Sequence, residues 1–359
     1  MPASKPGPKY VRVKNAISQE IRAGRLAPGD QVHSISRIMD EFHVSKVTAV
    51  RALAELEKEG LVRREHGRGT FVARPERSAA GRGRSVSVIV PDMKNPFHIE
   101  VVEALERRLR QLDVAVELVC TGYLAEVERS AFERASNEAH IAGAVLISTP
   151  VPHQIGLDVP PRLPLVVIDY CPPDLMGKCV FISCDNFGGG HEAAAHLASL
   201  GHTRIGQVRH TYSSQERSEG FGNGLEERGL TVSEEWILST ELGTPIGDDL
   251  VDWVRREHLT ALFALNDMLA MQAVQLLRGA GYDVPGDISL VGYDDVPAAK
   301  YIEVPLTTVG QHEELIGRRA ADCLMEGLEL PNRVLRPREV VIVPQLVVRA
   351  STAPPRSTE

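Results

Sequence analysis

Between residues 85 and 295 the sequence alternates short apolar runs with amphipathic stretches, and no other feature restricts the fold as strongly. The runs rich in β-branched residues predict strands, and the stretches with apolar residues at helical spacing predict helices. The predicted strands cover 85–91, 114–120, 142–148, 164–169, 204–210, 260–265 and 288–295, and the predicted helices cover 98–112, 126–140, 188–200, 215–229 and 267–280. This alternation predicts an α/β body of parallel sheets flanked by helices, with ligands bound beyond the carboxyl ends of the strands.

Charge divides the chain at about residue 84. Residues 1–84 contain 17 Lys and Arg against 9 Asp and Glu, a net charge of +8. The whole chain holds 40 basic and 48 acidic residues, so 23 and 39 remain for residues 85–359, a net charge of −16. A small basic head on a large acidic body suggests that the head binds a polyanion. Residues 73–84, which lack apolar periodicity, are the predicted linker, and residues 353–359 are the predicted tail.

The basic head, residues 1–72, has the pattern of a helix-turn-helix followed by a β-wing. Apolar residues at helical spacing predict a helix over 10–24, and Ser34 and Ser45 are positioned to cap two further helices separated by a short break. The turn over 66–69 then joins two short strands, so the predicted wing has a basic tip.

This head resembles the winged helix-turn-helix domain of the GntR family. The matching segments are Tyr10, LAPGD (26–30), Phe42 to Thr48, Ala52 to Leu56, Glu59 to Val62 and HGRGTFV (66–72). The resemblance implies that the third helix enters the major groove of DNA and that the wing reaches the minor groove. The DNA-binding residues that we predict are Ser45, Lys46, Val47, Thr48, Arg51, Arg63, Arg64, His66, Gly67, Arg68, Gly69 and Thr70. The family usually has arginine near the start of the second helix, where this chain has Ser36 with Arg37 beside it, and arginine is also common at the positions of Lys46 and Val50. The resemblance therefore gives no operator sequence. A winged helix used for protein contact is the open alternative.

The body, residues 85–352, resembles the effector domain of the LacI/GalR repressors, which shares the fold of periplasmic sugar-binding proteins. The matching motifs are NPF (95–97), HLASLGHTRIG (196–206), R-x-x-G-F (217–221), ALFALND (261–267), VPGDISLVGYDD (284–295), PLTTVGQ (305–311) and LVVRAST (346–352). The resemblance implies two lobes joined by three crossings, an effector in the cleft between them, and a dimer formed side by side. We predict the crossings near 184, 308 and 335. Lobe 1 then covers 85–184 and 309–335, and lobe 2 covers 185–308 and 336–352.

Polar residues at the predicted strand ends match the effector contacts of this family. We predict an effector site formed by Asn95, Phe97, His98, Asp169, Arg217, Asn266, Asp294 and Gln311. Such a mixture of hydrogen-bonding groups and a few rings suits a polyol. Asp267 is predicted to cap the following helix instead. Sugar-responsive relatives often have an aromatic ring where this chain has Leu242. Asn95, Phe97 and His98 could equally be turn, core or surface residues.

The sequence contains no P-loop, GxSxG or HExxH motif, so it has none of these enzyme signatures. The five cysteines contain no CxxC pair, and Cys171, Cys179 and Cys184 form the only loose group, so we predict reduced thiols and neither a metal nor a cofactor. No apolar run is long enough for a membrane span, and we expect a cytoplasmic protein.

The combination predicts a dimeric, DNA-binding repressor of carbohydrate-utilisation genes that a small sugar-like effector releases from its operator. The alternative is a corepressor-dependent or activating regulator that responds to a non-sugar ligand.

Overall fold

The computed structural model describes residues 9–22, 26, 30–58, 61–65, 69–72, 85–148, 163–211, 215–330 and 332–356. The chain divides into two compact units, residues 1–82 and 83–359. The predicted linker, 73–84, lies outside the described residues, as do residues 357–359 of the predicted tail. The predicted fold class, a winged head followed by a two-lobed α/β body, is confirmed.

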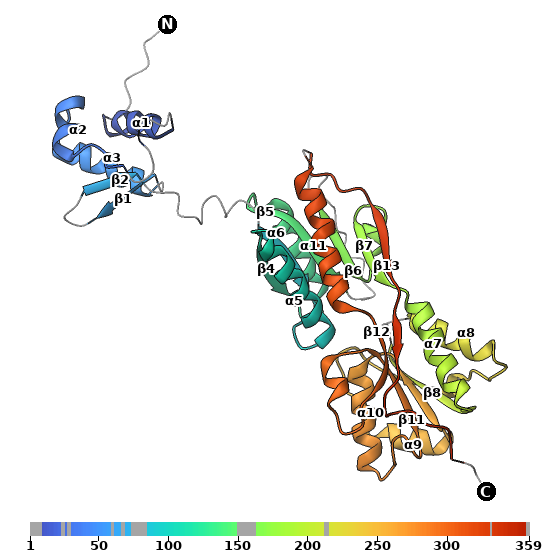
Figure 1. Cartoon of the computed structure of the whole chain (residues 1–359). Helices are drawn as coiled ribbons and strands as arrows, with labels where there is room; N and C mark the ends of the chain where they lie inside the picture. Colours follow the sequence, from blue (N-terminus) through green and yellow to red (C-terminus); the bar gives the residue numbers. More distant parts are fainter. Residues whose placement is uncertain are drawn as a thin grey trace. The chain divides into compact units, whose positions relative to one another are not determined.

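The first unit is a small helical domain with a two-stranded antiparallel wing (Figure 1). Its elements are α1 (Lys9–Arg22), α2 (Ile35–Phe42), α3 (Lys46–Lys58), β1 (Val62–Glu65) and β2 (Gly69–Val72). The Ser34 side chain accepts a hydrogen bond from the Arg37 N–H at 3.2 Å and caps α2, as predicted. His43 ends α2 in the left-handed conformation, with φ of 50°. The Ser45 hydroxyl accepts from the Thr48 N–H at 3.3 Å, so α3 begins directly after the tight turn.

The helices and the wing of this unit share one buried apolar cluster. Ile17, Ile38, Leu53 and Val62 are among its members, and each is almost fully buried. Backbone hydrogen bonds of 2.8 Å also join residues 30–32 to β2, from Val32 to the Thr70 carbonyl and from Val72 to the Asp30 carbonyl. The wing is therefore fixed to the helical part of the unit at its base.

Lobe 1 of the second unit is a parallel six-stranded sheet with the order β13-β7-β6-β5-β3-β4. Its elements are β3 (Ser85–Val90), α5 (Pro96–Gln111), β4 (Ala115–Cys120), α6 (Ala125–Asn137), β5 (Ile141–Ser148), β6 (Leu165–Asp169), η1 (Pro173–Leu175), β7 (Val180–Cys184), α11 (Glu313–Glu329) and β13 (Arg338–Ile342). Helices α5 and α11 lie side by side and bury one face of the sheet, and α6 covers the other face (Figure 1). β3 and β5 are buried along their whole length because helices lie on both sides of them.

Lobe 2 has the strand order β14-β12-β11-β10-β8-β9, and only β14 is antiparallel to its neighbour. Its elements are α7 (Asn186–Ser199), β8 (Ile205–His210), α8 (Gln215–Glu226), η2 (Glu234–Trp236), β9 (Ile237–Thr240), α9 (Asp249–Arg256), β10 (Ala261–Ala264), α10 (Asp267–Gly279), β11 (Ser289–Asp294), η3 (Pro297–Lys300), β12 (Thr307–Gly310) and β14 (Gln345–Val347). Helices α9 and α10 cover one face and α7 and α8 the other, each over its own apolar cluster.

The chain passes between the lobes three times. The first passage, from β7 to α7 at Asp185, lies where we predicted it. The second lies at 311–312, after β12, because all of β12 pairs with β11 in lobe 2. The third lies at 343–344, so our prediction near 335 was wrong: β13 pairs in parallel with β7 from Arg338 to Ile342 and belongs to lobe 1. Lobe 1 therefore extends to 342, and the last part of lobe 2 begins after it.

Candidate functional site

A cavity of about 430 Å³ lies between the two lobes, at the carboxyl ends of their parallel strands. This volume is within the range of about 300–1,000 Å³ that is typical of small-molecule sites. All eight residues predicted from the sequence line it: Asn95, Phe97, His98 and Asp169 from lobe 1, Arg217, Asn266 and Asp294 from lobe 2, and Gln311 from the second crossing. The geometry thus brings the predicted residues together in one place.

Arg217 holds the centre of the lobe 2 wall. It is 4% exposed, and its Nε donates to Asn186 Oδ1 at 2.7 Å. Its Nη1 donates to the Leu265 carbonyl at 2.8 Å and lies 3.3 Å from Asp294 Oδ1. The guanidinium also lies over the Tyr293 ring, 3.9 Å from the centroid. A buried cation with this many partners is a fixed part of the wall.

Asp294 and Gln311 complete this polar centre. Gln311 Nε2 donates to Asp294 Oδ1 at 2.6 Å. Burial raises the pKa of Asp294 to about 6, although Arg217 and Gln311 act in the opposite direction. The backbone of Asp294 has φ of 118° and that of Asp169 has φ of 72°, both in a region that side chains disfavour. Strained backbone of this kind tends to gather at ligand sites, where the surrounding structure holds it.

The helix cap that we predicted for Asp267 is made by Asn266, which also lines the cavity as predicted. The N-cap of α10 is Asn266, whose Oδ1 accepts from the Leu269 N–H at 2.8 Å. Asp267 is fully buried and accepts from the Thr308 hydroxyl at 2.6 Å and from the Val296 N–H at 2.9 Å. It therefore joins three segments of lobe 2 behind the cavity, and burial raises its pKa well above the usual value. Because the cap uses the Asn266 oxygen, the amide NH₂ of Asn266 is the group left for a ligand.

The lobe 1 wall is built around the turn after β3. Asp92 Oδ1 accepts from the N–H groups of Lys94 and Asn95 at 2.7 and 2.9 Å, and Asn95 caps α5 by accepting from Phe97 N–H at 3.1 Å. His98 Nδ1 lies 3.1 Å from the Asp92 carbonyl, and burial lowers the pKa of His98. Asn95 therefore has both of the roles that we considered, because it shapes the turn before α5 and also lines the cavity.

Sequence reasoning missed about half of the cavity. The additional lining residues are Asp92, Lys94, Tyr123, His210, Gly243, Thr244, Met268, Leu269 and Gln272, beside Leu242. Asp92, Tyr123 and His210 all stand at or just past the ends of parallel strands, so the strand-end rule applied to every strand would have found them. Leu242 also lines the cavity, and together with Met268, Leu269 and the rings of Phe97 and Tyr123 it supplies the apolar part of the wall.

The predicted DNA-binding residues of the head occupy α3 and the wing. Val47 is 77% exposed at the start of α3, and the Thr48 hydroxyl lies 2.9 Å from that of Ser45. Arg51 stacks over the Tyr10 ring, with 4.2 Å between the guanidinium carbon and the ring centroid. Arg64 is engaged within the domain: it donates to the Val50 carbonyl at 3.1 Å and pairs with Glu57.

The remaining predicted DNA-binding residues divide into two sets. Lys46 is the first residue of α3, Arg63 lies in β1, and Gly69 and Thr70 begin β2. His66, Gly67 and Arg68, at the predicted wing tip, lie outside the described residues.

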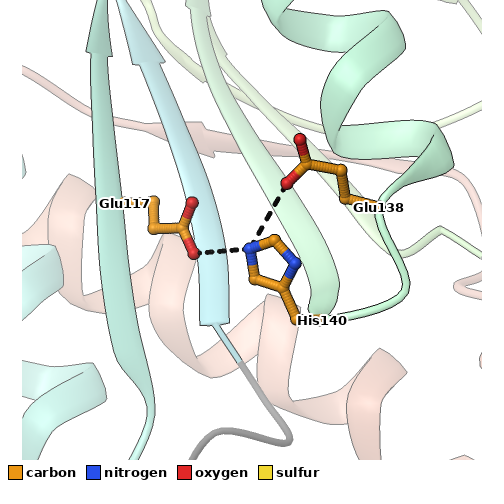
Figure 2. A group of neighbouring side chains, drawn as sticks. All are labelled: Glu117, Glu138 and His140. Carbon is orange, nitrogen blue, oxygen red and sulfur yellow. Dashed lines mark hydrogen bonds and ion pairs between the residues drawn. The ribbon is translucent and has the colours of Figure 1, made fainter. Parts of the chain in front are cut away.

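Among the described residues, Glu117, Glu138 and His140 form the one group whose atoms could hold a metal ion together (Figure 2). His140 Nε2 lies 2.9 Å from a Glu117 carboxylate oxygen and 3.4 Å from one of Glu138. The Arg134 guanidinium also pairs with both carboxylates, at 3.6 and 3.5 Å. Because a cation of the protein already pairs with both carboxylates, we describe these residues as an ion-pair network.

Two family models match the chain. Residues 9–72 match the bacterial regulatory proteins of the gntR family, and residues 194–352 match the periplasmic binding protein-like domain. The first match covers the winged head, and the second covers most of lobe 2 and α11 to β14. No helix among the described residues is long and apolar enough to cross a membrane.

Similar proteins are transcriptional regulators and not enzymes. The chain is 28% identical over 360 residues to the arabinose metabolism transcriptional repressor of Geobacillus stearothermophilus, which covers 96% of this chain and 98% of the relative. It is 30% identical over 282 residues to the HTH-type transcriptional regulator DegA of Bacillus subtilis, covering 76% and 82%. Among solved structures, a LacI family transcriptional regulator from Enterococcus faecium with bound ribose is similar, with a TM-score of 0.63 and 25% identity, covering 76% of this chain and 100% of that one.

Proposed function

Because the chain belongs to the bacterial HTH-type transcriptional regulators, with a gntR-family head and a periplasmic binding protein-like body, we propose that it is a sugar-released repressor of carbohydrate-utilisation genes. The proposed effector is a neutral sugar, bound in the cavity between the lobes. Two similar proteins support this class, since one is named for arabinose metabolism and another was solved with ribose. The protein would act in the cytoplasm, where it meets operator DNA.

The observation that carries the proposal is an unused acceptor on Gln311. This side chain is 2% exposed and lines the cavity, and its Oε1 is buried without a hydrogen-bond partner among the described residues. A buried polar atom without a partner costs about 1–3 kcal/mol, which a hydroxyl of the ligand would offset by donating to it. Because Gln311 lies on the crossing between the lobes, such a hydrogen bond would join the effector to the segment that moves when the lobes move.

The charges around the cavity favour a neutral effector. Asp92, Asp169 and Asp294 contribute three negative charges against the positive charges of Lys94 and Arg217, so the lining has a formal net charge of −1 with neutral histidines. Arg217, the buried cation, is already paired with Asp294. A sugar phosphate or sugar acid would therefore bring uncompensated negative charge into the cavity.

We propose that the body forms a homodimer side by side, so that two heads bind a pseudo-palindromic operator. Base and phosphate contacts are assigned to Ser45, Lys46, Val47, Thr48, Arg51, Arg63, Arg64, His66, Gly67, Arg68, Gly69 and Thr70. Closure of the lobes around the sugar would alter the spacing of the heads through the linker 73–84. A coupling free energy of about 1–3 kcal/mol is typical of such a switch.

The test combines thermal shifts with operator binding. The full-length protein is screened against pentoses, hexoses, their phosphates and their aldonic acids, and then each hit is added to a gel-shift assay on the protein's own promoter. A ligand present at 100 times its Kd adds about 2.7 kcal/mol of stability to the body. Gln311→Ala should lose this shift while it retains operator binding. The matched control is Gln207→Ala, because Gln207 is also a buried glutamine but lies in β8 of lobe 2 and does not line the cavity.

Three results would contradict parts of the proposal. If only phosphorylated or acidic sugars shift the transition, the neutral-ligand argument is wrong. If a sugar binds but tightens the complex with DNA, the protein is a corepressor-dependent or activating regulator. If Gln311→Ala and Gln207→Ala respond alike, the assigned cavity is not the effector site.

A further inference from the structure

Two of the five cysteines face each other in a loop beside the effector cavity. The chain turns back sharply after β6, where Asp169 has φ of 72° and the Tyr170 N–H donates to the Ile168 carbonyl at 3.0 Å. The following loop carries Cys171 and returns over the face of the sheet to Cys179, the residue before β7. The two Sγ atoms lie 3.9 Å apart within the apolar cluster that α6 covers.

The two thiols differ in how solvent reaches them. A second cavity, of about 610 Å³, is lined by residues of both lobes and by Cys171 but not by Cys179. Cys179 is 4% exposed, and its thiol lies 3.4 Å from the Leu175 carbonyl. A small solute that enters the second cavity therefore meets Cys171 first. The contact with Cys179 also lowers the pKa of Cys171, against the effect of burial, and raises that of Cys179.

Every charged side chain that lines the second cavity is acidic, and no Lys, Arg or His lines it among the described residues. The acidic side chains are Asp169, Asp185, Glu216, Glu219 and Glu339. Such a lining repels anionic oxidants, among them oxidised glutathione, and admits a neutral one. Hydrogen peroxide is small, neutral and able to form hydrogen bonds, so it fits both the charge and the access route.

We propose that Cys171 and Cys179 are a modification site at which hydrogen peroxide forms a reversible disulfide within lobe 1. The Cys171 thiolate attacks one oxygen of the peroxide, the O–O bond breaks, and sulfenic acid and hydroxide result. The Cys179 sulfur then attacks the Cys171 sulfur, and the hydroxyl leaves as water with the proton from Cys179. In total, two thiols lose two electrons and two protons, and one peroxide becomes two waters.

The geometry allows this bond with a local movement only. A disulfide needs about 2.05 Å between the sulfurs, so they must approach by about 1.9 Å from their separation of 3.9 Å. Side-chain rotation and a small shift of the loop supply such a movement. The resulting ring, residues 171–179, starts two residues after Asp169, which lines both cavities. The disulfide would therefore restrain a loop that adjoins the effector cavity.

The experiment uses the full-length protein in a Cys120→Ala background, because Cys120 is the exposed cysteine. The protein is treated with a few equivalents of hydrogen peroxide, blocked with iodoacetamide and digested with trypsin without reduction. Trypsin cleaves after Arg162, Lys178 and Arg204, so Cys171 and Cys179 fall in separate peptides. We expect these peptides to be joined, two of the four remaining thiols to be lost, and dithiothreitol to restore both.

Cys184 is the necessary control because it shares the second cavity with Cys171 and the tryptic peptide with Cys179. Cys184→Ala should retain the crosslink, and Cys179→Ala should lose it and accumulate a dimedone adduct on Cys171. The same amount of oxidised glutathione should form at least tenfold less crosslink. A crosslink that persists in Cys179→Ala but disappears in Cys184→Ala would overturn the assignment, and so would four intact thiols after peroxide treatment.

Discussion

Glu128 tests how strongly the interior of lobe 1 opposes a negative charge. This residue lies in the first turn of α6, is 3% exposed, and accepts a hydrogen bond from the Ser148 hydroxyl at 3.1 Å. Burial raises the pKa of Glu128 from 4.5 to about 7, against the smaller effect of Ser148. Each pKa unit corresponds to about 1.36 kcal/mol, so the ionised form of Glu128 costs about 3 kcal/mol of folding free energy above pH 7.

The direction of the pH effect follows from proton binding. Between pH 4.5 and 7 the folded protein binds more protons at Glu128 than the unfolded chain does, so this contribution to stability falls as the pH rises. Glu128→Gln removes the titration and keeps an oxygen that can accept from Ser148. We therefore expect the variant to be about 2–3 kcal/mol more stable than the parent at pH 8 and close to it at pH 4.5.

Urea unfolding followed by far-UV circular dichroism at pH 5, 6, 7 and 8 measures this difference. Glu133→Gln is the matched control, because Glu133 lies on the same helix and is exposed. The control should follow the parent at every pH. If Glu128→Gln and the parent show the same pH dependence, the buried carboxyl is not responsible, and if the variant is less stable at pH 8, the sign of our reasoning is wrong.

Three further predictions concern the site and the head. Effector affinity should fall as the pH drops from 7 to 5, because a ligand hydroxyl donates to the ionised carboxylate of Asp294, whose pKa is raised to about 6. Asp294→Asn should abolish this pH dependence in calorimetric titrations. Gly190→Ala should destabilise lobe 2 by about 3 kcal/mol, because its methyl group would overlap the Arg217 backbone. Gly222→Ala, whose methyl group would meet only Val232 at 4.0 Å, should be neutral or stabilising in thermal melts. Val47→Ala should weaken operator binding about tenfold in gel shifts with an unchanged melting temperature, because Val47 is 77% exposed.

Local patterns placed the strands and helices that they predicted, but they did not predict β7, β9, α9, β12, α11, β13 or β14, nor the long-range pairings. Ser34 and Ser45 cap helices at the positions that the sequence predicts, and the bounds of the predicted strands agree with the observed ones within one or two residues. The third crossing was misplaced because the run that ends at Ile342 has the same composition whichever sheet it joins. Only the pairing of β13 with β7 decides its lobe, and no local pattern encodes that pairing.

The candidate site shows the same division between local and long-range information. Arg217, Asp294 and Gln311 were predicted from motif positions, and each lines the cavity. The cap of α10 was assigned to Asp267 instead of Asn266 because either side chain caps a helix equally well by itself. Thr308 and Val296, which hold Asp267, lie far along the chain, so the choice between the two residues depends on tertiary contacts.

The position of β3 constrains how a signal could leave the cavity. Its first residue, Ser85, follows the predicted linker and is bonded to the network of Figure 2, with its N–H on the His140 carbonyl at 3.2 Å and its hydroxyl on Glu117 at 2.7 Å. The cavity residue Asp92 lies just past the opposite end of the same strand. Six residues of strand separate the two ends by about 20 Å. A ligand in the cavity therefore lies about one strand length from Ser85, and we infer that any effect on the linker, which ends at residue 84, has to pass through lobe 1.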